Sequence, residues 1–355
     1  MNAAATMPAP GETLEDHPFL RACRREPVPY TPVWLMRQAG RYLPEYRRVR
    51  ERYSFLDLCR DSDAAAQVTV DTVRRLGVDA AIIFADILLP LIPMGLPLRY
   101  EKGDGPQISQ PLRTLQDVEA LHPVSVDESL GFVAQTVRLV RRELEGETPV
   151  IGFAGAPFTV ASYAIEGGGS RNYIATKSMM HRDPAAWHRL MDAVCSTTAA
   201  YLNMQVRAGA HALQLFDSWA GVLSPADYRE FVLPYSKRVI DAIQPRVPVI
   251  HFGTMTGSLL PLMRDAGGDV IGLDWRVDLD EAWNRLGQGV GVQGNLDPVM
   301  LFAGEANVRA GVRDVLTRAG GRAGHIFNLG HGVLPETPVE NVLALIDEVH
   351  EFSRR

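Results

Sequence analysis

Two arginines four residues apart, Arg37 and Arg41, lie in the stretch LMRQAGRY of a chain whose formal net charge is −6. A pair of guanidinium groups suits a carboxylate or a phosphate, because each planar group can donate two parallel hydrogen bonds. If the segment is helical, the two side chains share a face. The alternative is an exposed pair that solvates a loop, and the apolar neighbours Met36 and Tyr42 argue against it. The pair is therefore a candidate anion site.

Asp86 is a single carboxylate within the apolar run AIIFADILLPLI. A buried carboxylate loses its solvation unless it is hydrogen-bonded or faces a polar site. It could accept hydrogen bonds from backbone amides or cap a helix, which would be a structural role. Its position where an expected strand ends favours a role in chemistry instead.

Two further segments place polar groups where a ligand could approach. The stretch GFAGAPFTVASYAIEGGGS (152–170) contains Tyr163 and three consecutive glycines at 167–169. These glycines indicate a mobile lid or a close approach of backbone to ligand. His331 lies between two glycines after the last expected strand, which leaves space around its ring. A structural role remains equally open for Tyr163 and His331.

Composition excludes several classes of partner. The acidic balance argues against non-specific binding to nucleic acid or to anionic membranes, which requires a broad basic surface. The longest apolar run, 80–95, is broken by Asp86 and two prolines and is too short to span a bilayer. The N-terminus lacks a basic segment followed by an apolar one, so we expect a cytoplasmic protein with no nucleic-acid and no membrane partner. We expect no metal either, because there is no HExxH motif and the cysteines, Cys23, Cys59 and Cys195, form no CxxC pair.

Eight short apolar runs alternate with longer amphipathic segments. The runs are 33–36, 80–85, 150–154, 212–216, 248–252, 270–274, 290–294 and 325–329. Unbroken apolar strands that alternate with helices indicate a parallel sheet covered on both faces. Eight repeats favour a closed barrel over an open sheet, so the sequence predicts an α/β fold of the (β/α)8 TIM barrel type. No later linker divides the chain, and we expect a loose leader at 1–15 followed by one catalytic domain at 16–355.

Three of the expected helices carry clear end signals. The segment 61–77 begins with acidic residues and ends at Gly77, 224–243 opens with Ser224 as N-cap and Pro225 at its first position, and 279–287 ends at Gly287. In a barrel of this kind, catalytic groups lie where strands end and the next loops begin. The strand ends here carry Arg37, Asp86, Asp217, Ser218, His251, Asp274, Asn295 and His331. We therefore expect these side chains to gather at one end of the barrel.

The segments PVWLMRQAGRYLPEYR (32–47) and GFAGAPFTVASYAIEGGGS resemble the two signature segments of the uroporphyrinogen decarboxylase family. The likeness continues through FADIL, LQLFDSWAG, VQGNLDP and FNLGHGVLPETPVENV, and covers residues 16 to 352. It implies a cofactor-free, homodimeric TIM barrel that converts uroporphyrinogen III to coproporphyrinogen III on the route to haem. The residues that the resemblance places in the substrate site are Arg37, Gln38, Ala39, Gly40, Arg41, Asp86, Tyr163, Ser218 and His331.

The residue chemistry agrees with such a substrate. Uroporphyrinogen carries eight carboxylates, which arginines can bind, and four pyrrole N–H groups that can converge on one acceptor. Asp86 is the expected acceptor, and it would also stabilise the cationic ring that forms during decarboxylation. Because the pyrrole itself takes up the electron pair, no cofactor is expected. Asp86 and Arg37 are the expected catalytic residues.

Two other functions stay open. The related corrinoid-dependent methyltransferases share the barrel and use zinc, and they resemble one another in a His-x-Cys element after the fifth strand. In this chain that stretch reads HFGTMTG, with Gly253 at the cysteine position. A non-catalytic tetrapyrrole carrier would be marked by loss of Asp86 or the arginines, and none of them is lost.

Overall fold

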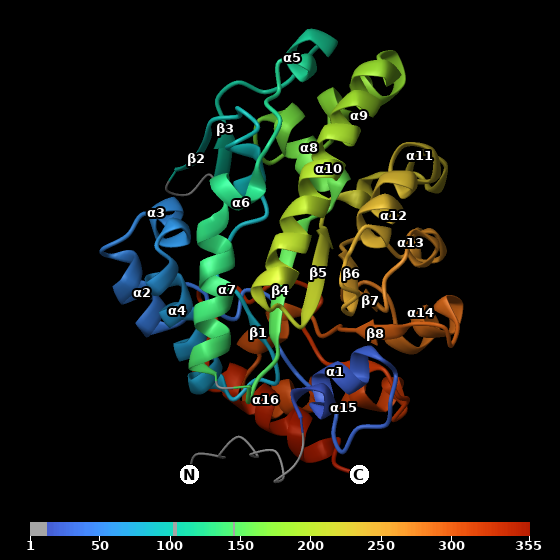
Figure 1. The fold of residues 1–355 in the computed structure, drawn as a ribbon. Helices are drawn as coiled ribbons and strands as arrows, with labels where there is room; N and C mark the ends of the chain where they lie inside the picture. Colours follow the sequence, from blue (N-terminus) through green and yellow to red (C-terminus); the bar gives the residue numbers. More distant parts are fainter. Residues whose placement is uncertain (1–12, 102–104, 145) are drawn as a thin grey trace.

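A curled sheet of seven parallel strands forms the centre of the computed structural model, which describes residues 13–101, 105–144 and 146–355. The strands follow one another around the sheet in chain order, β1-β4-β5-β6-β7-β8-β9, and the helices lie outside them (Figure 1). The strands are β1 (Ala81–Ile82), β4 (Val150–Gly155), β5 (Ala212–Asp217), β6 (Val249–Gly253), β7 (Val270–Gly272), β8 (Gly291–Gln293) and β9 (His325–Ile326). The α/β architecture and the parallel sheet predicted from the sequence are confirmed.

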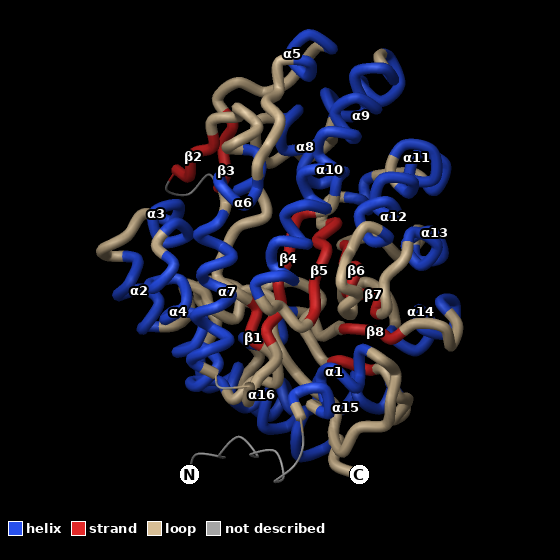
Figure 2. Tube along the Cα trace, viewed as in Figure 1, coloured by secondary structure: helices blue, strands red, loops and turns tan. Residues whose placement is uncertain are grey.

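The helices occupy most of the remaining chain (Figure 2). They are α1 (Pro18–Cys23), α2 (Pro44–Arg50), α3 (Phe55–Arg60), α4 (Ser62–Leu76), α5 (Leu115–Glu119), α6 (Val126–Ser129), α7 (Gly131–Glu143), α8 (Pro157–Glu166), α9 (Ile174–Arg182), α10 (Pro184–Ala208), α11 (Pro225–Phe231), α12 (Leu233–Asp241), α13 (Leu260–Ala266), α14 (Leu279–Leu286), α15 (Glu305–Ala319) and α16 (Val339–Phe352). Short 3-10 turns lie at η1 (Leu14–Asp16), η2 (Leu89–Leu91), η3 (Ala220–Val222) and η4 (Pro298–Phe302). Among the described residues, no helix is long and apolar enough to cross a membrane.

The predicted helix ends are largely correct. Helix α4 starts after Asp61, whose side chain accepts a hydrogen bond from the N–H of Ala64 (3.0 Å), and it ends at Gly77 with φ +69°. The segment expected as one helix at 224–243 is instead two helices, α11 and α12, with Val232 between them. Pro234 explains the break, because proline cannot donate the N–H that a continuous helix requires.

The barrel prediction is wrong for the first expected strand, which does not form. Residues 33–36 form only an isolated parallel bridge between Val33 and Phe327. On the other side, the carbonyl of Val33 accepts a hydrogen bond from the N–H of Asp79 (2.8 Å), just before β1. The segment therefore lies between the two edges of the curled sheet without pairing as a strand.

Side chains replace the missing strand ladder. Three side-chain oxygens accept backbone N–H groups of this segment: Asp79 Oδ2 from Val33 (2.7 Å), Gln38 Oε1 from Leu35 (3.1 Å) and Asn328 Oδ1 from Met36 (3.1 Å). Every buried backbone N–H needs an acceptor, and here the acceptors come from neighbouring loops rather than from strands. The described residues therefore show a seven-stranded curled sheet, not eight strands in a closed ring.

An antiparallel hairpin, which the sequence did not predict, follows the loop after β1. It consists of β2 (Leu98–Glu101) and β3 (Gly105–Ile108), and Ile108 donates a backbone hydrogen bond to the carbonyl of Gly167 (2.7 Å). A Cβ on Gly168 would lie 3.0 Å from Gln107 Oε1, so the glycines after α8 permit close contact with this hairpin. Gly167 and Gly168 therefore approach protein closely, and the lid or ligand contact expected for residues 167–169 stays a prediction.

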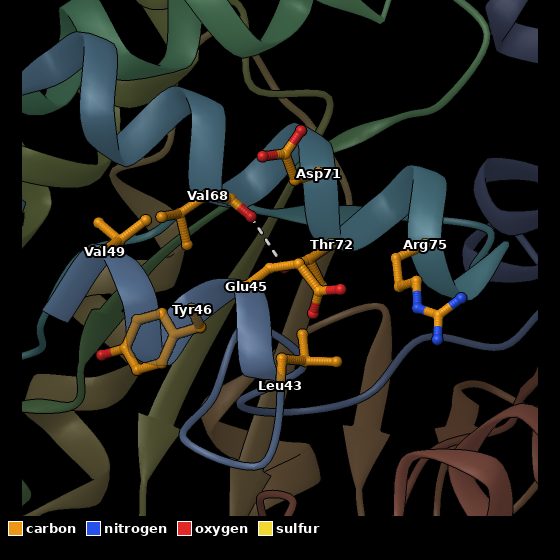
Figure 3. A pocket seen from close by; sticks show the side chains of 8 residues that line it. All are labelled: Leu43, Glu45, Tyr46, Val49, Val68, Asp71, Thr72 and Arg75. Carbon is orange, nitrogen blue, oxygen red and sulfur yellow. Dashed lines mark hydrogen bonds between the residues drawn. The ribbon is translucent and has the colours of Figure 1, made fainter. Parts of the chain in front are cut away.

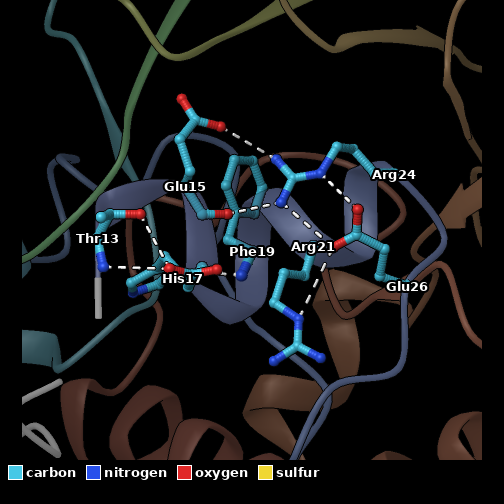
Figure 4. A network of polar contacts seen from close by, with 8 residues as sticks. Thr13, Glu15, His17, Phe19, Arg21, Arg24 and Glu26 are labelled. Carbon is cyan, nitrogen blue, oxygen red and sulfur yellow. Dashed lines mark hydrogen bonds and ion pairs between the residues drawn. The ribbon is translucent and has the colours of Figure 1, made fainter. Parts of the chain in front are cut away.

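The expected leader, 1–15, lies outside the described residues except for 13–15. Thr13 precedes η1, and its N–H donates to Asp16 Oδ2 (3.1 Å). Arg24, just after α1, donates to the carbonyl of Glu15 (2.6 Å) and to Glu26 Oε1 (2.8 Å), which ties η1 to the end of α1 (Figure 4). Residues 13–15 are therefore part of the folded structure.

Candidate functional site

Loops from distant parts of the chain interlock at the carboxyl ends of the strands. The N–H of Val333 donates to the carbonyl of Met36 (2.9 Å), which joins the loop after β9 to the turn before α2. A Cβ added to Gly332 would lie 2.6 Å from Cγ of Arg37, so the aliphatic part of Arg37 rests directly on this glycine. Only a glycine permits this contact, and it places Arg37 beside the loop that carries His331.

The loops after β5 and β6 meet in the same way. The hydroxyl of Thr254 donates to the carbonyl of Ser218. The ring of Tyr163, on α8, stacks on Trp219 with 3.7 Å between ring centroids. These contacts bring Ser218 and Tyr163 into one wall, and Ser218 is half-buried there.

Asp86 lies in the loop after β1 and is half-buried. Its Oδ1 accepts a hydrogen bond from the N–H of Leu88 (2.8 Å), and among the described residues no other donor reaches this carboxylate with ordinary geometry. Burial raises the pKa of Asp86, while the N–H of Leu88, the hydroxyl of Tyr100 and the charge of Arg37 lower it in part. Asp86 thus combines a backbone contact with acceptor capacity that the described residues leave unused.

Tyr100 lies close enough to Asp86 for each to shift the pKa of the other, which the sequence did not indicate. It extends from β2, its ring lies 4.6 Å from that of Phe55, and its buried hydroxyl makes no hydrogen bond of ordinary geometry with a described residue. Burial and the adjacent charge of Asp86 both raise the pKa of Tyr100, so its hydroxyl stays protonated. The Asp-Gly step at 104–105 could have signalled a hairpin, but no local pattern pairs Tyr100 with Asp86.

The two arginines differ in their surroundings. Arg37 has φ +60°, in the left-handed region that is uncommon for residues other than glycine and is held only by surrounding structure. Its charge lowers the pKa of both Asp86 and His331, whereas that of Arg41 acts on the pKa of Tyr46. Residues 36–41 do not form a helix, so the condition for a shared helical face is not met. Both side chains are exposed, and neither forms an ion pair with a described residue.

The residues between the arginines shape this turn. The side chain of Gln38 is buried and donates to the carbonyl of Ala80 (3.1 Å), in addition to its contact with Leu35. A Cβ on Gly40 would lie 2.8 Å from the carbonyl of Arg37, so the tight turn requires a glycine there. Ala39 is half-buried. Contacts from Gln38, Ala39 and Gly40 to a substrate stay predictions.

Tyr163 and His331 complete the group around Arg37. Burial most strongly raises the pKa of Tyr163, with Asp86 raising and Arg37 lowering it further. Burial, Arg37 and Arg276 lower the pKa of His331 to about 4, against a smaller opposite effect of Asp274. His331 is therefore neutral near pH 7 and can donate or accept a hydrogen bond without adding charge.

Some strand-end residues do not join this group. Asp217 and His251 are fully buried, with 3.7 Å between Oδ2 and Nε2, and Asp217 Oδ1 accepts a hydrogen bond from Thr159 (3.1 Å). The side chain of Asn295 is buried and donates to the carbonyls of Asp274 (2.9 Å) and Val277 (2.8 Å). The sheet and the loops therefore enclose these three side chains.

The residues for a zinc site are not assembled in the part of the chain that the structure describes. No three His, Cys, Asp or Glu side chains gather there in a metal-binding group. Gly253, at the position of the methyltransferase cysteine, is closely packed, since a Cβ there would lie 2.6 Å from Cγ2 of Thr256. His325 is likewise buried, with Nε2 3.0 Å from the carbonyl of Gly294.

Two cavities differ in size and place. One of about 20 Å³ lies between α2 and α4, beside Glu45 and Thr72, and has room for about one water molecule (Figure 3). The other, of about 280 Å³, lies beside His331 and Trp275 at the carboxyl ends of β7 and β9. Only the second is large enough to take part of an organic ligand.

Comparison with known proteins agrees with this arrangement. The family model described as uroporphyrinogen decarboxylase matches residues 14–352. Proteins named uroporphyrinogen decarboxylase from Carboxydothermus hydrogenoformans and Sorangium cellulosum are 55% and 56% identical, and the alignments cover 94% and 95% of this chain and 96% of each relative. A solved methyltransferase from Methanosarcina mazei has a TM-score of 0.82 at 17% identity, with 96% of this chain and 99% of that chain covered, which shows a shared fold alone. The chain belongs to the uroporphyrinogen decarboxylase family.

Proposed function

We propose that this protein decarboxylates the four acetate side chains of uroporphyrinogen III to methyl groups and releases coproporphyrinogen III, in the cytoplasm. The observation that carries the proposal is that Asp86, a half-buried carboxylate with unused acceptor capacity, lies within electrostatic range of the exposed guanidinium of Arg37. Relatives at more than half identity over nearly the whole chain carry this name, which supports the substrate.

The substrate fits both groups. Its four pyrrole N–H groups can point at one acceptor, and Asp86 supplies a carboxylate in surroundings that leave it few other donors. A charged acceptor strengthens each such hydrogen bond, particularly where water is excluded. Arg37 and Arg41 supply donors for the carboxylate arms in a chain of net charge −6.

Each decarboxylation follows from the chemistry of the pyrrole ring. A proton adds to the ring α-carbon next to the acetate-bearing carbon, and the ring becomes an iminium-like cation. The bond from the acetate methylene to its carboxylate breaks, its electron pair moves into the ring, and carbon dioxide leaves an exocyclic methylene. That methylene takes a proton to become methyl, and the ring loses its added proton, so one proton is consumed per carbon dioxide. Asp86 stabilises the cation, an effect that typically contributes about 3 kcal/mol per well-placed group.

Arg37 is proposed to hold the carboxylate arm that reacts and to assist proton delivery. Its stem packs against Gly332, so fewer of its torsions have to be ordered when the substrate arrives. A guanidinium is a reluctant acid, because it stays protonated in proteins. Holding the arm is therefore its main contribution, with Gln38, Ala39, Gly40, Arg41, Tyr163, Ser218 and His331 as the proposed remaining contacts of the substrate.

The activity can be tested directly against both alternatives. Purified protein is incubated with uroporphyrinogen III under reducing, oxygen-free conditions, and the products are then oxidised and separated by their number of carboxylates. We expect porphyrins with seven to four carboxylates, also after the protein has been treated with a chelator. A carrier would return only the octacarboxylate, and activity lost on chelation and restored by zinc would favour metal-dependent chemistry.

Membership of the family also supports a proposal for the domain organisation and the oligomeric state. We infer a single-domain TIM barrel, residues 16–355, whose first strand is reduced to the bridge at Val33, and we infer a homodimer. The exposed apolar side chains of Met255 and Val299 beside the larger cavity support a partner surface at this end of the barrel. Light scattering coupled to size-exclusion chromatography would give twice the chain mass for a dimer and the chain mass for a monomer.

A further inference from the structure

The cavity beside His331 extends the site beyond Asp86 and Arg37. Its volume of about 280 Å³ falls just below the roughly 300–1,000 Å³ typical of pockets that enclose a whole drug-sized ligand. It is lined by Thr254, Met255, Trp275, Arg276, Asp297, Pro298, Val299, His331 and Leu334. A space of this size admits one side arm of a larger molecule and not the entire macrocycle.

Arg276 is held in place within this lining. Its Nη1 donates to Oδ2 of Asp274 (2.7 Å), a carboxylate that is almost fully buried, and its Cζ lies 3.8 Å from the ring centroid of Trp275. The carboxylate and the aromatic face therefore fix the plane of the guanidinium before any ligand binds. Nε and Nη2 make no hydrogen bond with a described residue, so two donors remain available in a fixed fork.

The charges around the cavity decide how it could bind an anion. Asp274 balances the charge of Arg276, and Asp297, whose Oδ1 accepts a hydrogen bond from Val299 (2.9 Å), adds a negative charge to the lining. His331 is neutral near pH 7. Net charge therefore does not attract an anion here, and recognition depends on directed N–H donors, which select a planar carboxylate by its geometry.

His331 links this cavity to the main site. Both Arg37 and Arg276 lower the pKa of His331, so its ring lies within electrostatic range of the two guanidinium groups. The adjacent Gly332 carries the stem of Arg37. A molecule whose centre lies at Asp86 can therefore place one arm on Arg37 and another past His331 toward Arg276.

We propose that the cavity is a carboxylate subsite in which Arg276 binds one acidic arm of the substrate, and that it thereby sets the rotational position of the macrocycle over Asp86. This inference rests on the proposed function. The arm is an acetate or a propionate, since both present the same carboxylate to the guanidinium.

The test compares Arg276→Gln with a matched control, Arg322→Gln. Arg322 is also exposed and lies over a tryptophan, with Cζ 5.3 Å from the ring centroid of Trp283, but it does not line the cavity. For Arg276→Gln we expect KM for uroporphyrinogen to rise on the order of tenfold with kcat little changed, as loss of one charge-assisted hydrogen bond predicts. The control should keep both constants.

Inhibition by the product identifies the arm, because coproporphyrinogen has propionates and no acetates. Weaker inhibition of Arg276→Gln assigns the subsite to a propionate, and unchanged inhibition with a raised KM assigns it to an acetate. If Arg276→Gln fails to fold because Asp274 is left unpaired, the double variant Asp274→Asn with Arg276→Gln replaces it. If the wild type is active and Arg276→Gln has the same KM, the subsite proposal is wrong. If the wild type itself is inactive with uroporphyrinogen, the proposed function is wrong.

Discussion

Replacing Tyr100 with phenylalanine should move the acidic limb of the pH profile of kcat/KM to higher pH. The hydroxyl of Tyr100 lowers the pKa of Asp86, opposing burial, which raises it. Without this hydroxyl, only the N–H of Leu88 and the charge of Arg37 still oppose the effect of burial, so the pKa of Asp86 rises further. If the reaction proceeds as proposed, with Asp86 ionised, the variant should lose activity at a pH where the wild type still works.

The size of the shift follows from the strength of one hydrogen bond. A hydrogen bond to a charged group contributes about 1.5–3 kcal/mol, and one pKa unit corresponds to about 1.4 kcal/mol. Because the hydroxyl of Tyr100 lacks ordinary hydrogen-bond geometry, its effect is weaker than that of such a bond, and the limb should move upward by less than about one pH unit. On the alkaline plateau, where Asp86 is ionised in both proteins, kcat/KM should nearly coincide.

The assay measures kcat/KM for uroporphyrinogen III between pH 5 and pH 9. Titration of the substrate carboxylates affects every variant equally. The difference between the pH profiles of variant and wild type therefore reports only on groups of the protein. Tyr53→Phe is the matched control, because its hydroxyl donates to another aspartate, Asp61 (2.9 Å). A limb that stays in place in Tyr100→Phe, or moves to lower pH, would refute the reasoning about Asp86.

Three further predictions concern positions that hold the site or the fold. Arg37→Ala should raise KM and lower kcat, with kcat/KM reduced on the order of a hundredfold, and an unchanged kcat/KM would remove its assignment. Gly332→Ala should push the Arg37 stem aside and lower kcat/KM on the order of tenfold or more. The control Gly169→Ala, whose Cβ would meet no atom within 4 Å, should leave kcat/KM unchanged. Equal effects of the two substitutions would contradict the packing argument. Burial lowers the pKa of His350, but the attraction and hydrogen bond of Asp79 (2.8 Å) outweigh it and leave that pKa raised. His350→Gln should therefore lower Tm more at pH 6 than at pH 9, because this stabilisation is complete below about pH 6.5 and is lost as pH rises through the folded-state pKa.

The elements that the sequence predicted well are those whose signals are local. Strand β4 at Val150–Gly155 follows an unbroken apolar run, and α4 has both an acidic N-cap and a glycine at its end. Residues 33–36 carry an equally apolar run, but their N–H groups are taken by side chains that are distant in sequence, such as Asp79 and Asn328. A pattern within one segment contains no information about such partners.

The same distinction applies to the site. Asp86 and His331 could be found because each polar side chain interrupts or follows a strand. Tyr100 could not be found, because its place depends on a hairpin folding back to Asp86. Arg276 could not be found either, because the cavity that it lines is completed by Thr254 and His331, which are distant in sequence. His251, by contrast, falls within an expected strand, and it lies inside β6 and is fully buried.

The most direct test of the central claim is to measure kcat and substrate binding separately for Asp86→Asn. The variant keeps the shape of the side chain and loses the charge that stabilises the cationic ring. We predict that kcat falls on the order of a hundredfold to a thousandfold, while the dissociation constant for uroporphyrinogen, from equilibrium binding, changes by about tenfold or less. Turnover by Asp86→Asn at the wild-type rate would contradict the account.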